Sequence, residues 1–153
     1  MASKFAVEVE LKSNPQKVWE RINDYTNFFP KAFPQVFESV VALKGDGNSP
    51  GSVRLIKYGP EVPLKTITEK IELVDEENKK MSYSVIDGDI LKLYTVFKAT
   101  MEASSKGDGT LVTYSGEYER LNEQVPHPDN VTGFILNALL ALDAYLLSKN
   151  EKS

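Results

Sequence analysis

The feature that most constrains this chain is a long apolar stretch near its C-terminus, residues 129–149, DNVTGFILNALLALDAYLLSK. It predicts one long helix, because the Asp129 carboxylate can cap the first turn and Pro126 and Pro128 prevent an earlier start. At about 3.6 residues per turn, most of its large apolar residues share one broad face. That face is formed by Val131, Phe134, Ile135, Ala138, Leu142, Tyr145 and Leu146. Such a helix needs a large apolar partner, which the rest of the chain has to supply.

The opposite side of this helix is mixed rather than polar. Its polar or small residues are Asn130, Thr132, Gly133, Asn137 and Asp143, and the apolar residues among them are Leu136, Leu140 and Leu147. We therefore expect the helix to be covered on more than one side or to leave an apolar strip exposed. An exposed strip would favour a homodimer or another partner surface. Asn137 and Asp143 interrupt the apolar run, so we predict no membrane insertion.

The composition excludes several classes of function. The 153 residues suit one domain over 1–153. The net charge of −4 and the pI near 5.1 argue against nucleic acid as a partner, because phosphate binding needs a basic surface. The chain has no cysteine and one histidine, so we expect neither a thiolate nor a multi-histidine metal site, and no cofactor.

Two further expectations concern single regions. The one histidine, His127, lies between two prolines and is interpreted as a loop residue rather than a catalytic base. The N-terminus contains no long apolar run, so we expect no signal peptide and a cytoplasmic location.

The rest of the chain predicts two short helices and a series of strands. Alternation of apolar and polar residues indicates a strand at 5–11. Ser13 with Gln16 then fits a capping box for a short helix ending near Asn23–Asp24, and a second helical segment follows at 26–33. Six further strands are predicted at 36–44, 53–58, 64–74, 80–86, 91–103 and 111–119. Because strands joined by short turns pair antiparallel, we predict an α+β fold, one sheet of about seven strands with the long helix on one face.

The inner face of this sheet carries polar residues that a dry core does not favour. Arg54 and Glu69 alternate in step with apolar neighbours and so point inward, unless a bulge shifts the register. They either pair with each other, or one of them points outward. A hollow core with a few polar anchors is typical of a small-molecule pocket. The predicted pocket residues are Arg54, Ile56, Tyr58, Ile67, Glu69, Ile71, Tyr83, Val85, Phe97, Met101, Tyr114 and Tyr118 on the sheet, and Ile135, Ala138 and Leu142 on the helix.

A glycine-rich loop at 45–51 invites comparison with phosphate-binding loops. A phosphate-binding loop of the Walker type needs a Gly-Lys-Ser/Thr step that opens a helix, so that the helix N–H groups surround the phosphates. Here a strand follows, and Arg54 comes three residues after the last glycine. We therefore interpret the segment as a tight loop between two strands and not as a nucleotide site.

A set of short motifs in a fixed order resembles the plant major latex protein family, which is related to the pathogenesis-related class 10 proteins and the birch pollen allergen. The resemblance covers the whole chain. The motifs are FAVEVELKS at 5–13, FPKAFP at 29–34, GDG at 45–47, GSVRLIKY at 51–58, EKIE at 69–72, DEENK at 75–79, YSVIDGDIL at 83–91, FKAT at 97–100, KGDG at 106–109, YERLNE at 118–123 and LDAYLL at 142–147.

This resemblance implies a helix-grip fold, in which a seven-stranded antiparallel sheet wraps around the C-terminal helix and two short helices support it. It also implies an internal cavity that binds a hydrophobic plant metabolite such as a terpenoid, a sterol or a hormone. Proteins of this family are cytosolic and are linked to plant defence, stress and specialised metabolism.

The sequence departs from relatives of this family at three places. Residues 48–50 replace part of the glycine-rich loop of the class 10 proteins, and Arg54 stands where those proteins carry a lysine. Only Asp143 and Tyr145 match the residues of a ribonuclease activity proposed for that group, so we do not carry the activity over. Related condensing enzymes use a lysine near the end of the last strand, whereas this chain has Arg120 there, so we expect no Schiff-base chemistry.

Three functions stay open at this point, and we rank binding of a hydrophobic metabolite, as carrier or store, first. The second is a cofactor-free isomerase or cyclase acting on a reactive iridoid, terpenoid or alkaloid intermediate. Its catalytic candidates are Glu69 as an acid or base with a raised pKa, and Tyr83, Tyr114 or Tyr118 as donors to an oxyanion. The third is a regulator that changes partners on ligand binding, with gates at 59–62 and 87–89.

Overall fold

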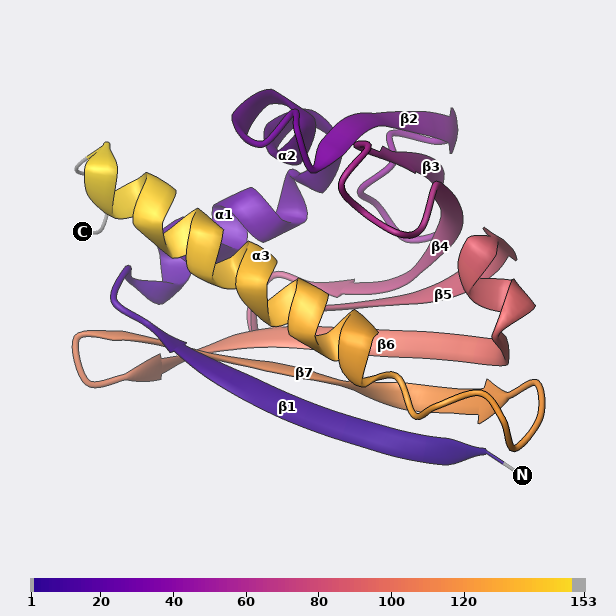
Figure 1. Ribbon diagram of the computed structural model, residues 1–153. Coiled ribbons are helices and arrows are strands. Elements are labelled where there is room, and N and C mark those ends of the chain that lie inside the picture. Colours follow the sequence, from indigo (N-terminus) through magenta and orange to yellow (C-terminus); the bar gives the residue numbers. More distant parts are fainter. Residues whose placement is uncertain (1, 150–153) are drawn as a thin grey trace.

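The computed structural model describes residues 2–149 as one curved antiparallel sheet with three α-helices (Figure 1). In chain order the elements are β1 (Ser3–Leu11), α1 (Pro15–Asn23), α2 (Tyr25–Ala32), β2 (Phe37–Lys44), β3 (Val53–Tyr58), β4 (Thr66–Asp75), β5 (Lys80–Gly88), the short 3-10 helix η1 (Asp89–Lys92), β6 (Tyr94–Lys106), β7 (Gly109–Arg120) and α3 (Asp129–Ser148). The sheet curves around α3, and α1 and α2 lie beside the C-terminal half of that helix. This is the predicted α+β helix-grip fold.

The sheet topology follows from consecutive hairpins. The strand order is β1-β7-β6-β5-β4-β3-β2, and all neighbouring pairs are antiparallel. β1 and β2 are therefore the two edges, and α1 and α2 connect them. The tight turn between β6 and β7 is the one predicted from KGDG, with Lys106 paired to Gly109.

The C-terminal half of α3 packs into the solid part of the core. Leu139, Leu142 and Leu146 are buried there, and α3 contacts β1 and α1. The Tyr145 ring lies against Phe28 of α2 at a centroid distance of 5.2 Å, in an edge-to-face arrangement that aromatic pairs prefer. This half of the helix thus has the large apolar partner that its sequence requires.

Asp143 anchors α3 to the junction between β1 and α1. Its carboxylate accepts hydrogen bonds from the backbone N–H of Lys12 (2.9 Å) and of Ser13 (2.9 Å), and from the Ser13 hydroxyl (2.7 Å). The sequence placed Asp143 on the polar side of the helix and Ser13 in a capping box, and both predictions are wrong. Asn14 is the N-cap of α1 instead, because its side chain accepts from the N–H of Lys17.

The start of α3 also differs in detail from the prediction. Asp129 is the first residue of the helix rather than its cap, and Pro128 holds the cap position without a side-chain hydrogen bond. Thr132, which the sequence placed among the outward polar residues, is buried. Its hydroxyl donates to the carbonyl of Asp129, so the first turn satisfies this buried group internally.

The strand prediction fails at the start of β6. The alternation predicts a strand from residue 91, but residues 89–92 form η1 and β6 begins at Tyr94. The pairing of β6 with β7 then shifts between Tyr94 and Val96. A bulge of this kind adds one residue to a strand and breaks the alternation. Tyr94 and Phe97 are therefore both buried, although their spacing along the chain is odd.

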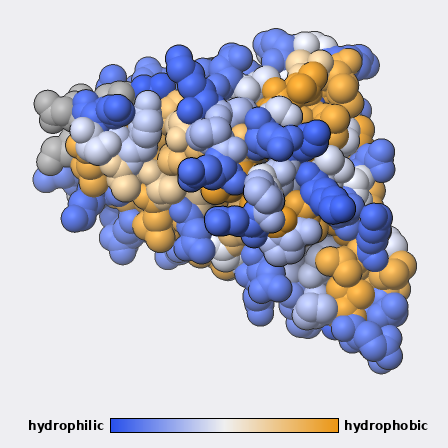
Figure 2. Space-filling view, turned by 45° about the horizontal axis from the view of Figure 1, so that its top comes forward, coloured by the Kyte–Doolittle hydropathy of each residue, from blue (hydrophilic) through white to orange (hydrophobic). Residues whose placement is uncertain are grey.

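Apolar residues are exposed at several places on the surface. On the face drawn in Figure 2, hydrophobic areas are separated by hydrophilic side chains. The exposed large hydrophobic residues are Val41, Leu43, Leu73, Ile86, Leu93, Leu121 and Leu140. On α3 the expected apolar strip is mainly Leu140, because Leu136 and Leu147 are half-buried. The homodimer stays a prediction.

Among residues 2–149, α3 is the one helix that is long and apolar enough to cross a membrane. This finding concerns length and composition alone, and the absence of membrane insertion stays a prediction. The structure gives a different reason for the composition, because α3 is the helix around which the sheet curves (Figure 1). The core helix of a soluble protein has the same length and apolar content as a membrane span.

We expect Asp143→Ala to lower the free energy of unfolding by about 2–4 kcal/mol, because hydrogen bonds to a charged group are lost and buried donors stay unsatisfied. Ser13→Ala, which removes only the hydroxyl donor, should cost about 1 kcal/mol. Asn137→Ala, at an exposed position of α3, should stay within about 0.5 kcal/mol. Urea unfolding followed by Trp19 fluorescence measures all three. Equal effects at Asp143 and Asn137 would contradict the anchoring role.

Candidate functional site

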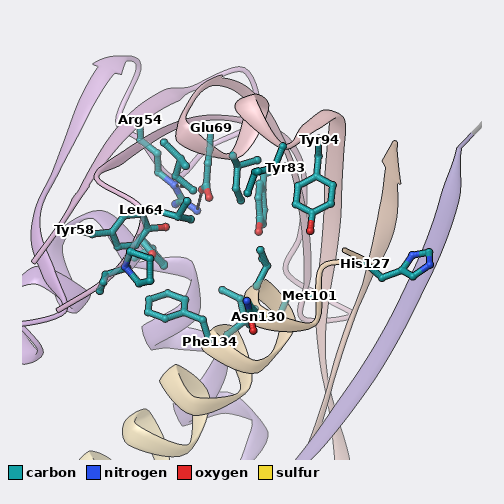
Figure 3. A pocket seen from close by; sticks show the side chains of 18 of the residues that line it. Arg54, Tyr58, Leu64, Glu69, Tyr83, Tyr94, Met101, His127, Asn130 and Phe134 are labelled. Carbon is teal, nitrogen blue, oxygen red and sulfur yellow. Dashed lines mark hydrogen bonds and ion pairs between the residues drawn. The ribbon is translucent and has the colours of Figure 1, made fainter. Parts of the chain in front are cut away.

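A cavity of about 250 Å³ lies between the inner face of the sheet and the N-terminal half of α3 (Figure 3). It is lined by Ile22, Tyr25, Arg54, Tyr58, Val62, Pro63, Leu64, Ile67, Glu69, Met81, Tyr83, Ile90, Leu93, Tyr94, Met101, Pro126, His127, Asn130, Val131, Phe134 and Ile135. Most of these side chains are apolar, and a small number of polar groups lie among them. Small-molecule sites usually have this composition.

The structure places some of the predicted pocket residues around this cavity and others in solid core. Those that line it are Arg54, Tyr58, Ile67, Glu69, Tyr83, Met101 and Ile135. Those that do not are Ile56, Ile71, Val85, Phe97, Tyr114, Tyr118, Ala138 and Leu142. Except for the half-buried Ala138, the second group is buried. Alternation along a strand identifies the inward face, but it does not show which part of that face stays open.

Position along α3 explains the division on the helix. Phe134 and Ile135, in the first half of α3, face the cavity. Leu142 and Leu146, two turns or more further along, are completely buried. The helix is therefore a cavity wall at its N-terminal end and core at its C-terminal end.

Several lining residues were missed by sequence reasoning. They are Ile22, Tyr25, Pro63, Leu64, Met81, Ile90, Leu93, Tyr94, Pro126, His127, Asn130, Val131 and Phe134, whereas Val62 lies in the loop predicted as a gate at 59–62. Met81 alternates in step with Tyr83, and Phe134 lies on the apolar face that contains Ile135, so the same patterns could have found both. The loop residues and Tyr94 have no such signal, because loops and a bulge place them.

The polar end of the cavity is an ion pair between neighbouring strands. Arg54 of β3 and Glu69 of β4 are direct partners in the sheet register. Arg54 donates through Nε to Oε1 of Glu69 (3.0 Å) and through Nη1 to the Gly47 carbonyl (3.1 Å). Its Nη2 lies 2.9 Å from the same Oε1 and completes the ion pair. The two side chains are 4% and 6% exposed, and both line the cavity. Of the alternatives that the sequence left open, the structure shows the pair, with both residues facing inward.

Electrostatics at this end are set by burial. Burial raises the pKa of the Glu69 carboxyl above its usual range, and the Arg54 guanidinium opposes this rise. Burial also raises the pKa of the phenols of Tyr25, Tyr58 and Tyr83, and the Glu69 charge adds to each rise. The phenols therefore stay protonated, and each keeps an O–H donor.

Aromatic packing holds the ion pair from a second side. The Arg54 guanidinium lies over the Tyr25 ring, with its carbon 4.4 Å from the ring centroid. This contact is a cation–π interaction, which gains strength where water is excluded. The glycine-rich loop contributes its Gly47 carbonyl to the same guanidinium and leads into β3 rather than into a helix. The loop thus supports the ion pair, as a loop between two strands.

Two other tyrosines contribute less directly. The hydroxyls of Tyr83 and Tyr114 are hydrogen-bonded at 2.7 Å, and only Tyr83 lines the cavity. Tyr114 is completely buried, so it can orient the Tyr83 hydroxyl but is not part of the cavity wall. The Tyr118 hydroxyl is hydrogen-bonded to Nδ1 of His127, an exposed residue of the loop before α3. In Figure 3 the His127 ring points away from the other labelled side chains, which fits a loop residue.

Within residues 2–149, the structure has no group of three or more His, Cys, Asp or Glu side chains that could hold a metal ion. The polar side chains in the cavity lining are Arg54, Glu69, Tyr25, Tyr58, Tyr83, Tyr94, His127 and Asn130.

Comparison with known proteins identifies the family. The model of the pathogenesis-related protein Bet v 1 family matches residues 1–149. MLP-like protein 423 of Arabidopsis thaliana is 44% identical over 146 residues, which cover 95% of this chain and 94% of that protein. The chain therefore belongs to the Bet v 1 family, whose members are soluble proteins that bind hydrophobic ligands. The resemblance to the major latex proteins is confirmed.

Two solved structures share the fold. The crystal structure of ginseng major latex-like protein 151 from Panax ginseng has a TM-score of 0.85 at 24% identity, covering 94% of this chain and 97% of that chain. Norcoclaurine synthase from Thalictrum flavum has a TM-score of 0.80 at 22% identity, covering 96% of this chain and 87% of that chain. At these identities the likeness concerns the fold alone, and this fold includes both a latex-like protein and a synthase.

We expect Arg54→Met to lower the free energy of unfolding by about 3–5 kcal/mol, because it leaves Glu69 as an uncompensated buried charge. The double variant Arg54→Met/Glu69→Leu should recover most of this loss, because apolar residues of similar volume replace a buried pair at little cost. Urea unfolding measures both. If the double variant is as unstable as the single one, the ion pair is not the cause.

The same single variant should show a particular pH dependence. Without Arg54 nothing opposes the effect of burial, so the pKa of Glu69 in the folded state lies above its unfolded value of about 4.3. A carboxyl with a raised folded pKa favours folding when protonated, so Arg54→Met should lose stability as the pH rises from about 4.3. The double variant should lack this dependence.

Proposed function

We propose that this protein binds a small hydrophobic plant metabolite, such as a terpenoid, in the cavity between the sheet and α3, as a carrier or store. The observation that carries the proposal is the cavity itself, with mostly apolar walls and one polar end formed by Arg54 and Glu69. Burial of apolar ligand surface supplies the driving force, at roughly 25 cal/mol per Å² before the costs of binding. A role in plant defence or specialised metabolism, in the cytoplasm, follows as the expected setting.

The shape of the cavity supports a compact ligand. Its volume of about 250 Å³ is near the lower end for small-molecule sites, which run from about 300 to 1,000 Å³. The loop residues Val62, Pro63 and Leu64 border it on one side and Phe134 on another. We propose that the ligand enters past these loops.

Cofactor-free catalysis on a reactive metabolite is the second candidate function. The observation in its favour is the Glu69 carboxyl, which faces the cavity and whose pKa burial raises. A group of this kind can exchange a proton with a bound substrate, and the Tyr83 hydroxyl can stabilise a developing negative charge. The charge and the hydrogen bond of Arg54 oppose this rise in the pKa and favour the ionised carboxylate over an acid, so we rank catalysis second.

We expect Ile135→Trp to weaken binding by about tenfold or more, since losing roughly 1.4 kcal/mol of apolar contact is sufficient. The control is Leu140→Trp, the same kind of change on the exposed side of α3, which should leave affinity unchanged. Native mass spectrometry with a panel of neutral mono- and sesquiterpenoids measures retained ligand for both variants and the unchanged protein.

Extracts of the same incubations distinguish the two candidate functions. A ligand that is recovered unchanged supports the carrier. Products that appear in proportion to protein concentration, and disappear with Glu69→Gln, would establish catalysis. Equal loss of binding in the Ile135 and Leu140 variants would contradict the cavity as the binding site.

A further inference from the structure

The polar end of the cavity contains one oxygen atom that the protein leaves without a hydrogen bond. Nε of Arg54 donates to Oε1 of Glu69, and Nη2 lies within ion-pair distance of the same oxygen. Among the described residues, no hydrogen bond involves the second oxygen, Oε2. The third Arg54 nitrogen, Nη1, donates to the Gly47 carbonyl. The ion pair is therefore asymmetric, since two Arg54 nitrogen atoms contact Oε1 of Glu69 and none donates a hydrogen bond to Oε2.

This second oxygen has to face the cavity. No completely buried side-chain nitrogen or oxygen among residues 2–149 lacks a hydrogen-bond partner, so Oε2 must reach open space. The Glu69 side chain is only 6% exposed and lines the cavity, so that space is the cavity. In Figure 3 the Glu69 carboxylate points into the space enclosed by the labelled side chains. The cavity wall thus carries a strong hydrogen-bond acceptor.

The cation of the pair is not equally available. The Arg54 guanidinium is held by Glu69, by the Gly47 carbonyl and by the face of the Tyr25 ring. A ligand carboxylate would lie beside the negative Oε2 in a medium that screens charge poorly, which is unfavourable. A ligand ammonium would bring a second cation to a carboxylate that Arg54 already neutralises, and burying it would cost much of its hydration.

Two phenols complete the polar end. Tyr25 and Tyr58 both line the cavity, and within the described part of the chain their hydroxyls make no hydrogen bond to another residue. Burial and the nearby Glu69 keep the pKa of both phenols above the usual value, so they are O–H donors. A ligand hydroxyl can donate to a carboxylate and accept from a phenol at the same time. An ether or a ketone can only accept.

We infer that the ligand of this cavity is a neutral alcohol, and that its hydroxyl donates a hydrogen bond to Oε2 of Glu69 and accepts one from Tyr25 or Tyr58. This inference rests on the proposed function and adds the chemical class of the ligand. The ion pair then acts as a selectivity element, because it accepts a hydrogen bond but offers no net charge. The apolar walls receive the hydrocarbon part.

The test compares four probes with one hydrocarbon skeleton: geraniol, geranyl methyl ether, geranic acid and geranylamine. At pH 8, calorimetric titration should show geraniol binding about 10- to 100-fold tighter than the methyl ether, the range for one hydrogen bond to a charged group. The acid and the amine should bind more weakly than the alcohol.

Two results would overturn the inference but leave the proposed function intact. One is equal affinity for the alcohol and the ether, and the other is tighter binding of the acid or the amine. If none of the four probes binds, the proposed function fails together with the inference.

Variants of the ion pair give a second, independent test. In Arg54→Met/Glu69→Leu, the preference for the alcohol over the ether, measured within that variant, should fall to about threefold or less, because the acceptor of the alcohol hydroxyl is gone. Glu69→Gln leaves the Arg54 cation uncompensated, so the acid should gain affinity relative to the alcohol. The control is Glu72→Gln, the same change at an exposed position of β4, which should keep the preference.

If the double variant keeps the preference for the alcohol, Glu69 is not the cause of that preference. Thermal unfolding of each variant establishes that the protein is folded. If Glu69→Gln does not fold, the double variant still decides the question, because it carries no unpaired buried charge.

Discussion

A sheet of seven strands is much wider than the single helix that has to cover it. Six strand spacings of about 4.8 Å give a width of roughly 29 Å, whereas a helix with its side chains is about 10–12 Å across. Curvature of the sheet around α3 reduces this mismatch, and α1 and α2 fill the space beside the C-terminal half of the helix (Figure 1). At the N-terminal half no further element fills it, and the cavity lies there. The binding site is thus the part of the apolar face that one helix leaves uncovered.

Much of the fold could be predicted because its signals are local. Alternation and turn residues predicted the strands, and a periodicity of 3.6 residues predicted α3. The predicted ends of these elements differ from the observed ends by a few residues. The errors arose where contacts with distant parts of the chain determine the position of a residue. Helical periodicity places Asp143 among the polar surface residues of α3. In the structure its side chain points inward, because its carboxylate accepts hydrogen bonds from the backbone N–H groups of Lys12 and Ser13. Tyr94 turns inward because β6 is paired to β7 through a bulge.

The candidate site was less predictable for the same reason. Patterns along one strand indicated that Arg54 and Glu69 face inward, but their partnership depends on the register between β3 and β4. Ile56 and Ile71 face the same way and are completely buried in solid core, although Arg54, Tyr58 and Ile67 beside Ile56 line the cavity. Alternation along a strand therefore does not separate core from cavity. Pro63, Leu64 and Tyr25 reach the cavity through the fold alone, so no pattern in the sequence could assign them. Val62, also in the lining, lies in the loop at 59–62 that the sequence analysis named as a gate.

The central claim is that the space between the sheet and the N-terminal half of α3 holds the ligand. A methyl NMR titration with geraniol tests it most directly, on protein labelled at isoleucine, leucine and methionine methyl groups. We predict large shift changes at Ile67, Met101 and Ile135, which line the cavity, and none at Leu43 or Leu140 on the surface. Shift changes confined to Leu43, Leu140 or other surface methyl groups would contradict the account, because they would place the ligand on the protein surface.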